Sequence, residues 1–251
     1  MTDPLEVLGT SASHLRDLVE GLKPSQLNAP AYPAEWTVAD VLSHLGSGAV
    51  VLQRYLEDTL AGSETPSDFA PSVWAEWDDK SSPIKATDSL LADQALLERL
   101  GSLTNEERAR FRFVMGPLSE DFPGFVCLRL NEHALHSWDI EVTLTPGAIL
   151  DPGAAALVVD RLETVIRFTG RPVDTDTRAL VRTNEPRRDF SITLGPGSVS
   201  LTPSTPGGKP DLELPAEAFV RLVYGRLDPE HTPPVDGDID LDTLRQAFPG
   251  P

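Results

Sequence analysis

Two histidines and one glutamate are spaced so that their side chains can meet at one metal ion. Glu132 and His136 stand four residues apart in a predicted helix, so they share one face about one turn apart. His44 lies in the middle of an earlier predicted helix, near its core-facing edge. Two imidazoles and one carboxylate with a vacant fourth position are typical of catalytic zinc sites. We therefore predict a divalent-metal site of His44, Glu132 and His136, with zinc as the expected ion.

Two neighbouring residues are expected to support this site. Asp139 follows His136 by three residues and is a candidate acceptor for an imidazole N–H, which would fix the tautomer and the orientation of the ring. Gly48 lies one turn after His44 and is expected to leave open space beside that imidazole. Spacing alone leaves alternatives open. His133 would replace His136 if the helix were turned, or would be a solvated residue, and a histidine within a helix is more often a hydrogen-bonded core residue than a ligand.

The composition narrows the classes of protein. The chain has 251 residues, of which 40% are hydrophobic and 24% charged, as in ordinary globular proteins of one large or two smaller domains. Its formal net charge of −18 would repel phosphate backbones, so we expect no nucleic-acid partner. No stretch approaches the roughly 20 apolar residues of a membrane helix. Residues 1–6 are acidic and lack the features of a signal peptide, so we expect a cytoplasmic protein.

The chain contains one cysteine, Cys127. A single cysteine excludes an intrachain disulfide and the zinc motifs built from several cysteines. Cys127 precedes Glu132 by five residues and so lies on a different side of the predicted helix. We therefore expect it to be a small core residue, and any thiol nucleophile to come from outside the chain.

Apolar residues at steps of three and four predict a helical first part of the chain. Thr37 is expected to cap one of these helices, with Asp40 in place of the glutamate of a capping box. Residues 63–86 are predicted as a long polar connection with Trp74 and Trp77 on a short amphipathic turn. The helices are predicted at residues 5–22, 37–61, 88–100 and 122–142, and a loop that packs back on the domain at residues 105–120.

The pattern changes in the second part of the chain. Short β-branched runs bounded by turn residues predict strands there, between helices. The fold class is therefore an α-helical bundle at residues 1–147, followed by a linking helix and a small α+β domain at residues 148–251. The helices are predicted at residues 151–168, 215–226 and 241–248, and the strands at residues 179–183, 190–194 and 198–202.

At these residues the chain resembles the mycothiol-dependent maleylpyruvate isomerase family. The resemblance lies in Trp36-Thr-Val-Ala-Asp-Val-Leu-Ser-His-Leu45 followed by Glu132-His-Ala-Leu-His136-Ser-Trp-Asp139. It extends to Leu214-Pro-Ala-Glu-Ala-Phe-Val-Arg-Leu-Val-Tyr-Gly-Arg226 and the later Val235-Asp-Gly-Asp238. The resemblance implies a DinB-like four-helix bundle followed by a small C-terminal α+β domain.

The resemblance also implies an enzyme with two cofactors. A metal, generally zinc, would be held at the positions of His44, Glu132 and His136, with Asp139 at a characteristic acidic position. Mycothiol would be the thiol cosubstrate, because a thiol bound to a dication loses its proton at neutral pH. The thiolate would add to an electrophilic small molecule. An isomerase would then rotate the adduct and expel the thiolate, giving cis–trans isomerisation, whereas an S-transferase would keep the adduct.

Arg226 is implied to pair with a substrate carboxylate, since its planar fork suits that partner. The alternative is a surface arginine at the end of a helix. Trp36 is either a wall of the pocket or a staple at the entry of a helix. The alternative functions are a mycothiol S-transferase or detoxification enzyme, a thiol-independent metalloenzyme of a biosynthetic pathway, and a binding protein without turnover. A bound metal would also be able to polarise a substrate carbonyl as a Lewis acid. The sequence predicts neither the substrate nor the oligomeric state.

Overall fold

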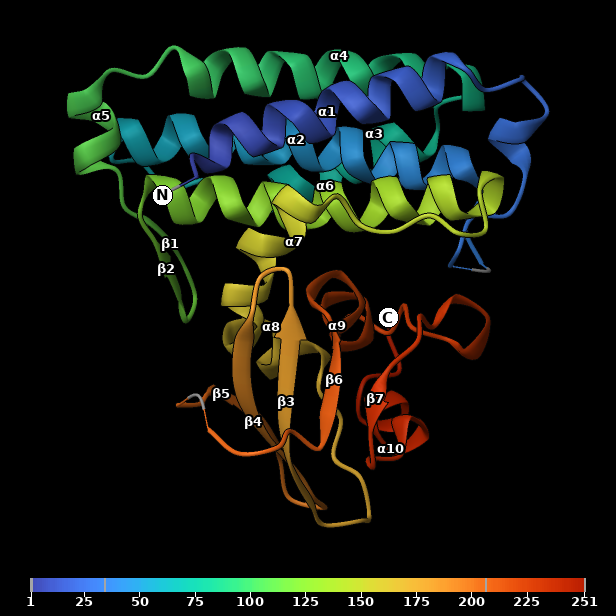
Figure 1. The fold of residues 1–251 in the computed structure, drawn as a ribbon. Coiled ribbons are helices and arrows are strands. Elements are labelled where there is room, and N and C mark those ends of the chain that lie inside the picture. The colour runs from blue at the N-terminus through green and yellow to red at the C-terminus, as the bar shows by residue number, and fades with distance from the viewer. Residues whose placement is uncertain (1, 34, 206, 251) are drawn as a thin grey trace. The chain divides into compact units, whose positions relative to one another are not determined.

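The computed structural model describes residues 2–33, 35–205 and 207–250. The chain divides into two compact units, Met1–Ala148 and Ile149–Pro251 (Figure 1). Among the described residues, no helix is both long enough and apolar enough to span a membrane. Each unit has its own core, so each is described by itself.

Long helices lying side by side build the first unit (Figure 1). Helix α2 packs against α4 and α6, and α1 packs against α6 and α4. Leu15, Leu42, Leu45 and Ile140 are completely buried where these helices meet. This arrangement confirms the predicted helical bundle. Its helices are α1 (Pro4–Glu20), α2 (Val38–Ala61), α4 (Ser82–Gly101) and α6 (Phe122–Leu144), with a short 3₁₀ turn η1 (Gln26–Asn28) after α1.

The start of α2 is fixed by its own sequence. The amide of Asp40 donates to Thr37 Oγ1 at 3.2 Å, and the amide of Thr37 donates to Asp40 Oδ2 at 3.1 Å. This confirms the predicted capping box, in which each side chain satisfies a backbone amide that the helix leaves without a partner. At the other end, Gly62 adopts φ 67°, a left-handed conformation that ends a helix without steric cost. Local chemistry thus determines where α2 begins, and with it the position of His44.

The predicted connection at residues 63–86 is wrong in most of its length. It contains helix α3 (Phe69–Asp78), and α4 begins at Ser82, well before the predicted start at Asp88. Helix α3 buries Trp77 while leaving most of its polar residues in solvent. Its amphipathic character depends on a few large side chains, and Pro71 in its first turn hides it from a search for long periodic runs.

The predicted loop at residues 105–120 is also wrong. It consists of helix α5 (Asn105–Arg110) and an antiparallel hairpin of β1 (Phe113–Met115) and β2 (Leu118–Glu120). Thr104 and Glu107 form a complete capping box at the start of α5. A threonine followed three residues later by a glutamate is the sequence signal for such a helix start.

The second unit is an α+β domain, which confirms the predicted fold class. Its sheet has the strand order β5-β4-β3-β6-β7. Strands β3 and β4 pair antiparallel, as do β4 and β5, in the predicted segments. The strands are β3 (Thr177–Asn184), β4 (Arg188–Leu194), β5 (Val199–Pro203), β6 (Leu212–Pro215) and β7 (Asp236–Gly237).

Two features of this unit differ from the prediction. Strand β6, which pairs parallel to β3, and β7, which pairs with β6, were not predicted. The predicted helix at residues 151–168 is broken by a 3₁₀ turn. The helical segments of the unit are α7 (Pro152–Val158), η2 (Val159–Arg161), α8 (Leu162–Thr169), α9 (Ala216–Val223), η3 (Pro229–His231) and α10 (Leu241–Ala247).

Candidate metal centre

The structure brings His44, Glu132 and His136 together from two helices of the bundle. Each residue offers one ligand atom, and these atoms all lie within 4.8 Å of one another. Glu132 Oε2 lies 3.1 Å from His44 Nε2 and 3.5 Å from His136 Nε2. His136 is buried, whereas the side chains of His44 and Glu132 are 41% and 44% exposed. The triad therefore has an inner wall and an open side from which a ligand can enter.

The chemistry of these side chains fits a divalent metal such as zinc. Two imidazole nitrogens and one carboxylate oxygen are the donor set of zinc sites that keep an open position. Desolvation raises the pKa of Glu132, but the hydrogen bonds to His136 and then to His44 outweigh it and hold that pKa well below its usual range. The carboxylate is thus charged and already shared between the two imidazoles. A cation at their centre would replace the protons that now join them.

Asp139 holds His136 in place. His136 Nδ1 lies 2.8 Å from Asp139 Oδ2, and the carboxylate of Asp139 is fully buried. Because a carboxylate accepts, Nδ1 carries the proton, and Nε2 faces Glu132. Burial alone would lower the pKa of His136, but the hydrogen bonds to Asp139 and to Glu132 outweigh it and raise that pKa. The arrangement of Asp139 is the one expected for a residue that supports a metal ligand.

Trp36 packs against both imidazoles. Its ring is stacked on His136 with centroids 5.9 Å apart and an interplanar angle of 18°, and its centroid lies 5.4 Å from that of His44. The two imidazoles themselves meet edge to face at 4.6 Å. Trp36 therefore forms a wall of the site and restricts both rings.

His133 lies outside the triad, and neither of the alternatives for it is correct. The residue is 0% exposed. Its Nε2 lies 2.8 Å from Asp93 Oδ2, and its Nδ1 lies 2.8 Å from Ser11 Oγ. Asp93 also pairs with the buried Arg129. His133 is therefore a hydrogen-bonded core residue and neither a solvated side chain nor a substitute for His136.

The role predicted for Gly48 is also wrong. A Cβ at this position would lie 3.3 Å from Arg129 Nη1, and the imidazole of His44 is not within 4 Å of it. The absent side chain thus makes room for the buried guanidinium. The contact joins α2 to α6, so the spacing of residues along α2 alone does not reveal it.

A pocket of about 380 Å³ adjoins the triad on the side of His44. Helix α2 and the end of α3 supply most of its walls. Pockets that bind small molecules have volumes of roughly 300–1,000 Å³, so this space is large enough for a ligand. Its lining residues are Trp36, Asp40, Ser43, His44, Ser47, Trp74 and Asp78.

Comparison with known proteins identifies the family. Residues 8–141 match the sequence profile of the mycothiol maleylpyruvate isomerase N-terminal domain, and this match covers more than half of the chain. The chain belongs to the mycothiol maleylpyruvate isomerase family. No curated protein is similar enough in sequence to count as a relative.

Two solved structures share the fold of this family member. The mycothiol-dependent maleylpyruvate isomerase aligns with a TM-score of 0.65 and 13% identity, over 90% of this chain and 89% of that chain. A point mutant of a mycothiol-dependent maleylpyruvate isomerase aligns with a TM-score of 0.64 and 13% identity, over 89% and 88%. At this identity the likeness shows the fold, which therefore covers both units.

Two other residues singled out in the sequence, Arg226 and Cys127, lie outside the triad. Cys127 is buried in α6, as expected for a core residue. Arg226 lies beyond the end of α9, after Gly225, whose φ of 68° turns the chain out of the helix. Arg226 is buried, and its Nη1 donates to the carbonyl of Tyr224 at 3.0 Å. It is thus not a surface arginine, and its pairing with a substrate carboxylate stays a prediction for this family member.

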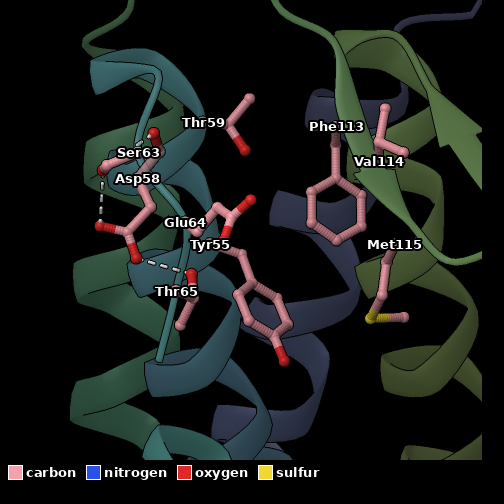
Figure 2. A pocket seen from close by; sticks show the side chains of 9 residues that line it. All are labelled: Tyr55, Asp58, Thr59, Ser63, Glu64, Thr65, Phe113, Val114 and Met115. Carbon is pink, nitrogen blue, oxygen red and sulfur yellow. Dashed lines mark hydrogen bonds between the residues drawn. The ribbon is translucent and has the colours of Figure 1, made fainter. Parts of the chain in front are cut away.

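A second hollow of the first unit is lined by the carboxylates of Asp58 and Glu64. It has a volume of about 370 Å³, and Figure 2 shows Tyr55 and the hairpin residues Phe113 to Met115 around it. Asp58 turns its carboxylate to Thr65 Oγ1 at 2.6 Å and Ser63 Oγ at 3.3 Å. The described residues that line it include no histidine. Its lining thus differs from the set of two histidines and one glutamate that forms the triad.

Proposed function

We propose that this chain is a metal-dependent enzyme that uses mycothiol as an external thiol for addition to an electrophilic small molecule. The reaction is a cis–trans isomerisation of the maleylpyruvate type, and the proposed location is the cytoplasm. The observation that carries the proposal is the convergence of His44, Glu132 and His136, whose ligand atoms lie within 4.8 Å of one another beside a pocket. Membership of the family supports the choice of mycothiol.

The side chains of the site have separate tasks in this proposal. His44, Glu132 and His136 hold a divalent ion, for which zinc is the expected element. Asp139 keeps the Nδ1 proton on His136 and so presents Nε2 as the ligand atom. Trp36 excludes water from one face of the imidazoles. Arg226 is proposed to orient a substrate carboxylate through its planar fork.

A bound divalent metal supplies the lowered thiol pKa that makes a thiolate available at neutral pH. In the proposed isomerisation, the thiolate sulfur forms a bond to one carbon of the substrate double bond, and the π electron pair of that double bond moves onto the conjugated carbonyl oxygen and returns when the sulfur leaves. Rotation about the resulting single bond is followed by breakage of the same carbon–sulfur bond. The thiol is regenerated and nothing is oxidised or reduced.

Metal analysis of the purified protein tests the site. We expect about one divalent ion per chain in the wild type and loss of that ion in His44→Ala. His14→Ala is the matched control, because His14 forms a similar histidine–glutamate pair with Glu141 at 2.9 Å outside the triad. A wild type without metal, or a His44→Ala variant with wild-type metal content, would refute the site.

Calorimetry and product analysis test the reaction. Mycothiol should bind to the zinc-loaded wild type and not to His44→Ala. With maleylpyruvate as substrate, the trans isomer should accumulate while the concentration of free mycothiol stays constant. Stoichiometric consumption of mycothiol would instead identify an S-transferase, and turnover without any thiol would identify a thiol-independent metalloenzyme.

A further inference from the structure

The pocket beside His44 has one wall that is set by a single interhelical contact. A Cβ on Gly46 would lie 2.2 Å from two ring carbons of Trp77, so α3 can approach α2 this closely only because residue 46 is glycine. Ser43 Oγ also donates to the carbonyl of Trp77 at 3.2 Å. With Trp77 held in this way, Trp74 and Asp78 lie one turn apart and line the pocket.

The polar atoms of this pocket are mainly hydrogen-bond acceptors. The hydroxyl of Ser43 donates to the Trp77 carbonyl, and that of Ser47 donates to the His44 carbonyl at 3.1 Å, so both oxygens face the pocket as acceptors. The carboxylates of Asp40 and Asp78 accept only. Apart from the indole N–H groups, the lining therefore favours a ligand that donates hydrogen bonds.

The charge of the pocket disfavours anions. Lys85 Nζ lies 3.0 Å from Asp40 Oδ1 and offsets part of its charge. Asp78 adds a second carboxylate on the exposed face of α3. A ligand carboxylate placed here would meet negative charge and acceptor oxygens, both of which are unfavourable. A donor-rich and uncharged ligand fits both conditions.

The remaining walls are flat aromatic surfaces. Trp36 and Trp74 line the pocket, and Trp74 is 50% exposed although it is a large apolar side chain. An exposed indole next to a pocket often marks a binding surface. The C–H faces of a sugar ring pack on such indoles while its hydroxyls donate to carboxylates.

We infer that this pocket binds a hydroxyl-rich, uncharged part of the thiol cosubstrate, and that Trp74 and Asp78 select such thiols against thiols that carry carboxylates. The inference rests on the proposed function. Mycothiol has this chemistry, since its cysteine is acylated at nitrogen and joined through an amide to a glucosamine–inositol unit. Glutathione, in contrast, carries free carboxylates. The pocket thus determines which thiol reaches the metal.

The test compares three thiols by calorimetry on zinc-loaded protein. Mycothiol carries the sugar unit, N-acetylcysteamine is an uncharged thiol without it, and glutathione is anionic. Trp74→Ala and Asp78→Asn should each weaken mycothiol binding by about tenfold, the equivalent of one good contact. Both variants should bind N-acetylcysteamine like the wild type and keep their zinc. Asp78→Lys should narrow the preference for mycothiol over glutathione.

Asp79→Asn is the matched control, because Asp79 is an exposed carboxylate next to Asp78 that does not line the pocket. Its affinity for all three thiols should equal that of the wild type. If Trp74→Ala and Asp78→Asn bind mycothiol as tightly as the wild type does, the inference is wrong while the proposed function stands. If the zinc-loaded wild type binds neither mycothiol nor N-acetylcysteamine, both are wrong.

Discussion

Helix α6 contributes side chains to two clusters of histidine, carboxylate and their partners, and the two clusters differ in their access to solvent. The inner cluster joins His133 and Arg129 of α6 to Asp93 of α4, and all three side chains are buried. The outer cluster joins Glu132 and His136 of α6 to His44 of α2, and two of its three side chains are partly exposed. A histidine and a carboxylate are thus used twice, within about two turns of the same helix.

The difference lies in how the acceptors are used. In the inner cluster, Asp93 accepts from Arg129 with one oxygen and from His133 with the other, and Ser11 bonds the far nitrogen of His133. These contacts hold α1, α4 and α6 together. In the outer cluster, a single oxygen of Glu132 lies near both imidazoles, so three ligand atoms surround one point. Closed networks of this kind stabilise a fold, whereas convergent atoms beside a pocket suit a ligand.

The largest predicted effect is on the inner cluster. Asp93→Asn removes the charge that balances the buried Arg129, and an unbalanced buried charge costs about 3–5 kcal/mol. We expect the free energy of unfolding to fall by about this amount in urea denaturation, while the folded protein keeps its metal. His44→Ala should show the opposite pattern, with lost metal and little change in the stability of the metal-free protein. If the free energy of unfolding of Asp93→Asn falls by less than about 1 kcal/mol, the inner cluster does not have the stabilising role that distinguishes it from the outer one.

Low pH should reduce the loss of stability caused by Asp93→Asn. Burial raises the pKa of Asp93, but the charges of Arg129 and then His133 outweigh it and hold that pKa far below its usual value of about 3.9. A lowered carboxyl pKa gives stability that is present above the unfolded-state pKa and is lost as the pH falls toward the folded-state pKa. The difference in stability between wild type and Asp93→Asn should therefore shrink below about pH 4. A constant difference from pH 7 to pH 3 would contradict this account.

A smaller effect on stability is expected at two glycines of α2, Gly46 and Gly48, which face different neighbouring helices. Gly46→Ala would push a methyl group into the Trp77 ring at 2.2 Å and should cost about 1–3 kcal/mol. Gly48→Ala meets Arg129 Nη1 at 3.3 Å, and a gain of roughly 1 kcal/mol in helix propensity offsets this contact. Thermal unfolding of the two metal-free variants should rank Gly46→Ala well below Gly48→Ala. Equal melting temperatures would show that the packing of α3 on α2 does not depend on the absence of a side chain at Gly46.

The last predicted effect concerns the support of a ligand and leaves the fold unchanged. Asp139→Asn keeps the shape of the side chain and weakens its bond to His136 Nδ1, so zinc affinity should fall by about 10–100-fold. Competition with a chelator of known affinity measures this change. Glu141→Gln is the control, since Glu141 bonds His14 outside the triad. If both variants retain wild-type zinc affinity, Asp139 has only a structural role.

The parts of the fold that depend on neighbouring residues could be predicted from the sequence. Thr37 and Asp40 form the expected capping box because its bonds lie within one turn. The spacing of Glu132 and His136 placed both on one face for the same reason. The meeting with His44 depends on packing between helices, and for that step the family resemblance was needed in addition to periodicity.

The parts that depend on distant contacts were missed. Helix α3 is held by Trp77 against Gly46, a contact that no local pattern reveals. Strand β6 gains its partner β3 only after the chain has passed through β4 and β5. The position of His133 was open because α6 is buried on nearly all sides, so its apolar residues do not indicate which histidine faces the core.

The attachment of α3 has a consequence for the divergence of such enzymes. This ten-residue helix contacts α2 through Trp77 and Ser43, while Trp74 and Asp78 face outward into the pocket. Substitutions at these two positions do not alter the contact of Gly46 with Trp77, the capping box of α2 or the three candidate metal ligands. Under the proposed function, changes at two positions of one short helix are therefore enough to alter the choice of thiol, and a combinatorial library at residues 74 and 78 explores the same change in the laboratory.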